Sequence, residues 1–202
     1  MQPLTETQVH TIREAIRSKY AQVAAAGAGG CFQYPIGPEG LLLQGYPPEV
    51  LEKIPAEILA TFCGVGNPFS LGPLHAGEAV LDIGCGAGVD SLVAAHLVGP
   101  AGRVVGLDVT EEMVVRARAN LERMALAQVS FQVGEAETLP FPENDFDLVI
   151  SNGVFNLALN KAQALTEAYR VLKPGGRFMA ADMVLVGEPP PEQAQSAESW
   201  FQ

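Results

Sequence analysis

Residues 79–88 read AVLDIGCGAG, and this stretch decides the fold. Its apolar residues predict a short strand buried on both faces, and the glycines after it let the backbone turn where side chains would block a ligand. Residues 89–98 are compatible with a helix, which would point its positive amino end at whatever lies above the turn. The stretch is therefore typical of a nucleotide-binding strand, turn and helix.

The neighbouring residues indicate which nucleotide this turn favours. The glycines alternate, at Gly84, Gly86 and Gly88. A dinucleotide fingerprint needs its third glycine where this chain has Val89, which disfavours an NAD-dependent dehydrogenase. Asp82 precedes the turn, and a buried acid suits a cation such as S-adenosylmethionine better than a pyrophosphate. Asp108, which ends an apolar run over 103–107, can accept both hydroxyls of a ribose. Taken alone, the glycines could serve only a tight turn.

Composition limits the classes of protein that the chain can belong to. The chain has 202 residues, 48% of them hydrophobic, which is enough for one domain with a substantial core. Its formal charge of -11 and its scattered basic residues argue against a nucleic-acid partner. We find no apolar run that could span a membrane and no secretory signal, and three cysteines predict reduced thiols. We therefore expect a cytoplasmic protein with no membrane partner.

The first third of the chain predicts a cap rather than a separate domain. Apolar residues at helical spacing predict an amphipathic helix over 7–23, and proline and glycine predict an irregular segment over 31–40. Residues 49–60 look helical, with a break at an internal proline. We assign residues 1–70 to a helical and loop cap over the nucleotide site, and residues 71–202 to the core that binds the cofactor.

Strands and helices alternate through the core, which predicts an α/β fold with a doubly wound, mostly parallel sheet. Further strands are expected at 129–133, 146–150 and 177–184, and further helices start after the capping residues Thr110 and Asn160. Pro174 and Gly175 are expected to stop the last of these helices. Residues 188–191 should be extended, and the residues after them could begin one more helix.

The motifs of the core resemble those of a known family. They are VLDIGCGAG (80–88), GLDVT (106–110), GEAETLPF (134–141), FDLVIS (146–151) and YRVLKPGG (169–176). In this order they resemble class I S-adenosylmethionine-dependent methyltransferases, which have a Rossmann-like fold. The segment from the GNP turn to residue 110, with SNGVFNL later, is similar to arsenite methyltransferases. The GEAETLPF loop is also similar to the ubiquinone and menaquinone biosynthesis methyltransferases, which are UbiE-like enzymes.

The resemblance implies a set of residues that hold S-adenosylmethionine. The methionine part would lie against the glycine turn, the ribose at Asp108 and the adenine at Glu135. The expected cofactor contacts are Asp82, Gly84, Cys85, Gly86, Gly88, Asp90, Asp108, Val109, Met113, Glu135, Ala136, Glu137, Ser151 and Asn152. The candidates to face the substrate are Asn152, Asn156, Cys63 and Cys31. We expect no metal, and no general base is assigned, because asparagine cannot remove a proton and no histidine lies in a motif.

The resemblance also shapes the expected function. Arsenite methyltransferases carry cysteines where this chain has Val65 and Gly153, so two of the expected thiol ligands are missing. We expect methyl transfer to a small molecule. The alternatives are C- or O-methylation of an organic substrate, or binding of the cofactor or its demethylated product without turnover. Class I sheets have two more strands after the fifth, so this sheet is expected to look truncated, with its edge exposed or covered by a second copy in a homodimer.

Overall fold

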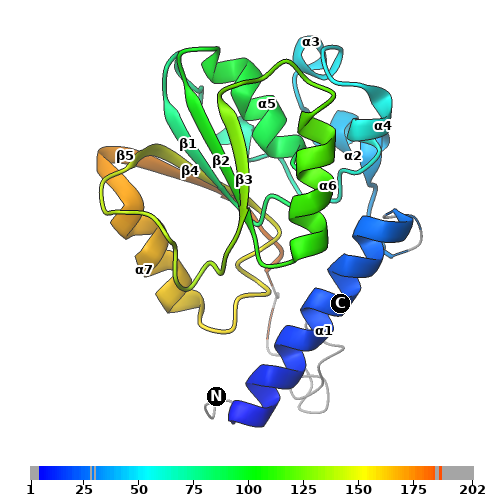
Figure 1. The fold of residues 1–202 in the computed structure, drawn as a ribbon, viewed down its shortest axis with the longest axis vertical. Helices are drawn as coiled ribbons and strands as arrows, with labels where there is room; N and C mark the ends of the chain where they lie inside the picture. Colours follow the sequence, from blue (N-terminus) through cyan, green and yellow to red (C-terminus); the bar gives the residue numbers. More distant parts are fainter. Residues whose placement is uncertain (1–4, 28, 30, 185–186, 188–202) are drawn as a thin grey trace.

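A five-stranded parallel sheet forms the core of the computed structural model, which describes residues 5–27, 29, 31–184 and 187. The strands are β1 (Ala79–Ile83), β2 (Arg103–Asp108), β3 (Val129–Val133), β4 (Phe146–Asn152) and β5 (Leu172–Ala181). They lie in the order β3-β2-β1-β4-β5, and every neighbouring pair is parallel (Figure 1). The predicted α/β, doubly wound sheet is confirmed.

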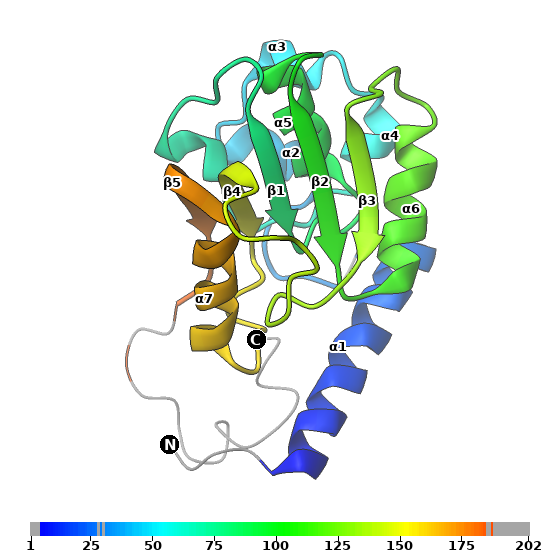
Figure 2. The same ribbon diagram turned by 60° about the vertical axis from the view of Figure 1, so that its left-hand side comes forward.

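Helices cover both faces of this sheet (Figure 2). They are α5 (Val89–Val98) and α6 (Glu111–Leu121) on one face and α7 (Lys161–Val171) on the other. Alternate residues of a strand point to opposite faces. Leu81 of β1 accordingly packs in the cluster that contains Ala168 of α7, whereas its neighbour Val80 packs with Ala94 of α5. The strands are therefore buried on both sides, as their continuous apolar sequence predicts.

The first third of the chain packs directly on this core. Its elements are α1 (Glu6–Ala26), α2 (Gly37–Leu43), α3 (Pro48–Leu51), α4 (Ala56–Leu59) and the 3-10 helix η1 (Pro68–Leu71). The apolar stripe of α1 is buried at Ile12, Ile16 and Val23, and Val23 packs against Met113 of α6. Side chains of α2, α3 and α4 form one apolar cluster with α5. The division into a cap, residues 1–70, and a core that binds the cofactor, residues 71–202, stays a prediction.

Two local expectations are wrong, and a third is only partly confirmed. Helix α2 begins at Gly37 inside the segment expected to be irregular, because Pro38 occupies the first turn, where its missing N–H costs nothing. Thr110 is the N-cap residue of α6, as expected, but its side chain makes no capping bond, and its backbone N–H donates to Asp108. The last strand is expected over 177–184, but β5 begins at Leu172, directly after α7, and ends at Ala181, so Pro174 and Gly175 lie within the strand.

The ladder between β4 and β5 is irregular at this proline. Leu172 pairs with Phe146, and the next pair joins Arg177 to Leu148, so the residues between them bulge out of the ladder. A proline has no N–H to give to the neighbouring strand, and Gly175 has a φ of 80°. Among the described residues no strand lies on the outer side of β5, whereas the extended segment and last helix expected after residue 187 lie outside those residues. No described helix has the length and apolar character to cross a membrane.

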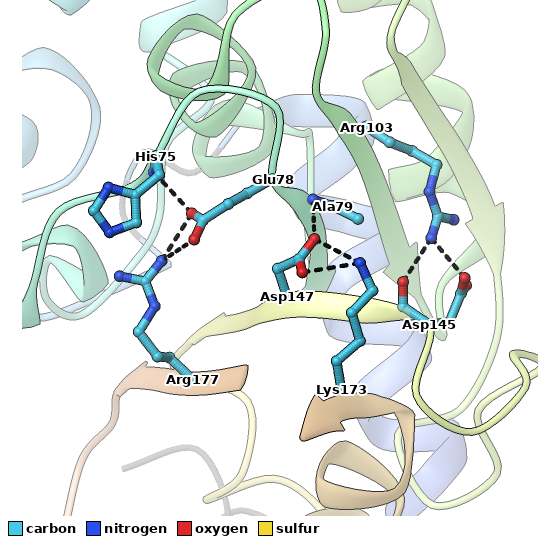
Figure 3. A network of polar contacts seen from close by, with 8 residues as sticks. All are labelled: His75, Glu78, Ala79, Arg103, Asp145, Asp147, Lys173 and Arg177. Carbon is cyan, nitrogen blue, oxygen red and sulfur yellow. Dashed lines mark hydrogen bonds and ion pairs between the residues drawn. The ribbon is translucent and has the colours of Figure 1, made fainter. Parts of the chain in front are cut away.

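Ion pairs join the amino ends of the strands (Figure 3). Arg177 of β5 contacts both carboxylate oxygens of Glu78, at 2.6 and 2.7 Å, and Lys173 contacts Asp147 of β4 at 2.8 Å. Asp147 also accepts a bond from the N–H of Ala79 at 2.8 Å. These contacts tie three strands together at the edge where each strand begins.

We expect Arg177→Met to lower the free energy of unfolding by about 1 kcal/mol, more than an exposed pair contributes, because its partner Glu78 is only 14% exposed. Urea unfolding in low and high salt measures this, and the loss should shrink in high salt. Lys173→Met is the matched control and should cost less, since Lys173 and its partner Asp147 are both more exposed than Arg177 and Glu78. Equal stability of Arg177→Met and the native chain would contradict the expectation.

Candidate cofactor and substrate site

One large cavity lies at the carboxyl ends of the strands, under α1. Its walls come from segments that are far apart in the sequence. They are residues 13–20 of α1, the segment around Phe32 and Tyr34, the turn at 63–65, the glycine turn, and the segments after β2, β3 and β4. Ligands of open α/β sheets bind at this edge, beside the point where the strand order reverses. Here that point lies between β1 and β4.

The amides of the glycine turn are used inside the protein. The N–H groups of Gly84 and Cys85 donate to the carbonyl of Leu107 at 2.7 and 3.0 Å, and that of Gly86 donates to the carboxylate of Asp108 at 2.9 Å. The N–H of Gly88 donates to the carbonyl of Cys85 at 2.8 Å. A pyrophosphate cradle needs such amides for the ligand. This turn therefore offers little to a phosphate.

Three buried acids lie around the turn: Asp108 lines the cavity, and Asp82 and Asp90 lie behind the lining. Asp82 accepts a bond from the hydroxyl of Ser91 at 2.6 Å, and Asp90 accepts bonds from Tyr46 and Asn152 at 2.5 and 3.0 Å. Burial raises the pKa of Asp82 and Asp108, and it raises the pKa of Asp90 to about 6. A cation near these acids would favour their charged forms, so the site suits a positively charged ligand better than an anion.

Helix α1 closes the side of the cavity next to β3. Arg13 and Arg17 lie 3.4 and 3.3 Å from Glu135, which follows β3. Ile16, Lys19 and Tyr20 of the same helix also line the cavity. Sequence reasoning missed these five residues as site residues, although the apolar stripe of α1 showed that the helix must lie on another surface.

The far end of the cavity is apolar and aromatic. The ring of Phe32 lies 6.5 Å from that of Tyr20 and 5.3 Å from that of Tyr34, measured between centroids, and all three line the cavity. The thiol of Cys63 lies here, and burial, with the nearby acids, raises its pKa to about 12. A thiol with this pKa is protonated at neutral pH.

Val65 and Gly153 face each other across this end. A Cβ atom added at Gly153 would lie 3.2 Å from a methyl carbon of Val65. Both residues line the cavity. The two positions at which the resemblance implies thiols are therefore neighbours in space, and here an isopropyl group and a glycine occupy them.

The structure brings some of the expected site residues to the cavity and leaves others behind it. Those that line it are Gly84, Gly86, Asp108, Val109, Glu135, Ala136, Glu137, Asn152, Asn156 and Cys63. Those that are buried behind the lining are Asp82, Cys85, Gly88, Asp90, Met113 and Ser151. Cys31 is exposed and is not part of the lining. The roles of all these residues stay predictions.

The described residues offer neither a metal site nor a histidine base at the cavity. No three His, Cys, Asp or Glu side chains among them are placed to hold one metal ion. His10, His75 and His96, all within the described part of the chain, are absent from the cavity lining.

Comparisons with known proteins give the family. A family model described as "Methyltransferase domain" matches residues 74–201. The arsenite methyltransferase of Halobacterium salinarum is 37% identical over 185 residues, which cover 85% of this chain and 47% of that protein. The ubiquinone/menaquinone biosynthesis C-methyltransferase UbiE of Hydrogenovibrio crunogenus is 41% identical over 125 residues, which cover 61% of this chain and 49% of that protein.

A solved structure agrees with these sequence comparisons. The crystal structure of an arsenic(III) S-adenosylmethionine methyltransferase from Chlamydomonas reinhardtii superposes with a TM-score of 0.62 and 40% identity, over 67% of this chain and 48% of that one. The chain spans about half the length of the curated relatives it matches. Motifs, sheet order and comparisons agree, and the chain belongs to the methyltransferase domain family.

Proposed function

We propose that this chain binds S-adenosylmethionine and transfers its methyl group to a small molecule. One observation supports this above all: a single cavity joins the glycine turn, whose amides are bonded within the protein and which has buried acids around it, to an apolar and aromatic end. The empty space of the cavity, its open mouth included, is about 1190 Å³. The proposed activity is that of a domain whose relatives are about twice as long.

The residues present fit this cofactor. A Cβ atom added at Gly86 would meet nothing within 4 Å, so the space above the turn is open. Asp108 would hold the ribose and Glu135 the exocyclic amine of the adenine, and both carboxylates line the cavity. When bound, the cofactor supplies an electrophilic methyl group on a sulfonium.

The chain's own task in such a reaction is alignment and exclusion of water. The transfer is an in-line displacement, so orientation of the nucleophile accounts for much of the rate. Helix α1 and the segment around Phe32 cover the cavity and would keep water out. Two carboxylates of the lining, Asp108 and Glu135, are proposed to hold the cofactor. The third, Glu137, accepts bonds from the N–H groups of Leu159 and Asn160, and we assign no general base.

Binding of the demethylated product, S-adenosylhomocysteine, tests the cofactor site. We expect calorimetric titration to show binding to the native chain and at least about tenfold weaker binding to Asp108→Ala, because a hydrogen bond to a charged group contributes about 1.5–3 kcal/mol. Glu112→Ala, which changes an exposed acid of α6, is the control and should bind normally. A native chain that fails to bind the ligand would refute the proposed function.

Two acceptors follow from particular observations. An arsenite-like acceptor is supported by the relatives and by Cys63, the one cysteine of the lining. An organic acceptor, methylated on carbon or oxygen, is supported by the aromatic walls and by Asn156. The Oδ1 atom of Asn156 is buried with no hydrogen-bond partner among the described residues, and a hydroxyl group of a ligand would satisfy it.

Assays of Cys63→Ser and Asn156→Ala distinguish these acceptors. Methyl transfer to arsenite with glutathione should fall in Cys63→Ser if the thiol holds the metalloid, and unchanged transfer would remove Cys63 from that role. Transfer to a phenolic acceptor should fall in Asn156→Ala with an unchanged affinity for S-adenosylhomocysteine. Tight binding of that product without turnover of either acceptor would instead favour a non-catalytic binding protein.

We also propose a cytoplasmic location and a homodimer. The location is supported by the three free cysteines, Cys31, Cys63 and Cys85. The homodimer is supported by the outer edge of β5, which has no neighbouring strand among the described residues, and by Phe178, which is 38% exposed there. Light scattering coupled to size-exclusion chromatography measures the mass, and a monomer at all concentrations would contradict the dimer.

A further inference from the structure

The side chain of Asn152 makes five contacts at the end of β4, all of them within the protein. Its Oδ1 atom accepts bonds from the N–H groups of Val65 and Gly66 at 2.8 and 3.1 Å. Its Nδ2 atom donates to the carbonyl of Gly66 at 2.7 Å and to the carboxylate of Asp90 at 3.0 Å, and lies 3.2 Å from the hydroxyl of Tyr46. Both ends of the amide are therefore occupied by protein partners.

The turn over residues 63–66 packs directly against the side-chain amide of Asn152. A Cβ atom added at Gly64 would collide with the amide nitrogen of Asn152, and one added at Gly66 would lie 2.7 Å from the Cβ of Ala181. Real Cβ atoms do not approach other atoms so closely. The turn can lie this near to β4 only because both positions are glycine.

The same turn forms a wall of the apolar end of the cavity. Cys63 and Val65 both line the cavity, and Val65 lies opposite Gly153, the residue after Asn152. A second set of bonds holds the turn from the other side: Gln44 donates to the carbonyl of Gly64 and Tyr34 donates to that of Cys63, both at 3.0 Å. Gln44 and Tyr34 belong to the first third of the chain, whereas Asn152 belongs to β4 and therefore joins the turn to the sheet itself.

We propose that Asn152 is a positioning residue. By holding residues 65 and 66 at the end of β4, it fixes the position of the acceptor wall, the part of the cavity wall that Cys63 and Val65 form and that would face the methyl acceptor. This inference rests on the proposed function for the meaning of that wall. Asn152 acts through Cys63 and Val65, and it is neither the hydrogen-bond partner of the acceptor nor a contact of the cofactor. Its amide type matters because it must accept from two N–H groups and donate to a carbonyl and a carboxylate at once.

The experiment measures the wall and the cofactor site separately. In the Asn152→Ala variant, we expect N-ethylmaleimide to modify Cys63 at least tenfold faster than in the native chain, because the turn loses its attachment to β4. The affinity for S-adenosylhomocysteine should stay within threefold. Peptide mass spectrometry distinguishes the cysteines, with the exposed Cys31 as a fast reference and the buried Cys85 as a slow one. For any acceptor the native chain methylates, the KM for the acceptor should rise more than kcat falls.

Asn120→Ala is the matched control. This buried amide donates to the carbonyl of Ala87 in the glycine turn at 2.9 Å. Its loss should weaken binding of S-adenosylhomocysteine and leave the modification rate of Cys63 unchanged. Each asparagine variant should thus change one of the two measurements and leave the other unchanged.

If Asn152→Ala does not fold, exchanging the residue types at positions 152 and 90 provides a second test. Asn152→Asp places a second carboxylate beside Asp90 and should speed the modification of Cys63, whereas Asn152→Asp combined with Asp90→Asn restores a donor and an acceptor and should slow it again. An unchanged Cys63 rate in Asn152→Ala, or no rescue by the swap, overturns the inference. A more than tenfold loss of product affinity in Asn152→Ala also overturns it, by assigning Asn152 to the cofactor. Failure of the native chain to bind the product would refute the proposed function instead.

Discussion

Replacing Gly84 by alanine should strongly weaken the binding of S-adenosylhomocysteine. Gly84 has a φ of 73°, which an alanine adopts only at a cost of about 1–3 kcal/mol. An added Cβ would also collide with the side chain of Val154, in the loop after β4. Overpacking of this kind costs a further 1–3 kcal/mol or so. Because Gly84 and Val154 both line the cavity, the strain is relieved by moving the cofactor wall, and we expect at least about a hundredfold loss of affinity.

Two further variants separate the collision from the backbone strain. Gly99 has a φ of 71° and a Cβ there would meet nothing within 4 Å, so Gly99→Ala should lower stability without changing the affinity. Combining Gly84→Ala with Val154→Ala should recover part of the binding, because the colliding methyl groups are gone. Calorimetry measures the affinity and urea unfolding the stability. Native affinity in Gly84→Ala would show that the glycine turn is not where this ligand binds.

The ligand-free chain should become more stable as the pH falls from 7.5 to 5. Burial raises the pKa of Asp82, Asp90 and Asp108 above the usual value of about 3.9, so the folded chain binds protons that the unfolded chain does not. Stability therefore falls as the pH rises through this range. With a folded pKa of about 6, Asp90 alone should contribute about 1 kcal/mol by pH 5.

Two variants isolate this effect. Burial lowers the pKa of His96, so the unfolded chain binds a proton there more readily than the folded chain, and this reduces stability as the pH falls. His96→Gln should therefore increase the gain in stability between pH 7.5 and 5. Asp90→Asn should make it smaller. The measurements stop at pH 5 because Asp147 and Glu167 have lowered pKa values and lose their stabilising charge in more acidic solution. A free energy of unfolding that drops between pH 7.5 and 5 in the His96→Gln variant would contradict the prediction.

The parts of the fold that local patterns determine were predictable from sequence. Strand β1 and helix α5 occur at the predicted residues, because an apolar run followed by glycines and a helix former carries its own signal. The course of β5 was not predictable, since Pro174 is accommodated by a bulge against β4, and that depends on the neighbouring strand. Local propensity indicates where the chain prefers to turn, but pairing with β4 keeps residues 174 and 175 within the strand.

The site shows the same division between local and long-range information. The residues after β1, β2 and β3 could be placed from their motifs, because the carboxyl ends of parallel strands meet at one edge. Arg13 and Arg17 could not be placed, since their contact with Glu135 joins residues more than a hundred positions apart. Nor could the clamp formed by Asn152, whose partners at 65 and 66 lie in a turn without regular structure.

The ion pairs of Figure 3 affect which substitutions this domain can tolerate. They secure the starting edge of the sheet, and the cavity occupies the finishing edge. Substitutions that retune the chemistry at one edge leave the fastening at the other intact. Residues of the cavity can therefore be substituted without weakening these ion pairs, which makes the domain a practical starting point for directed evolution.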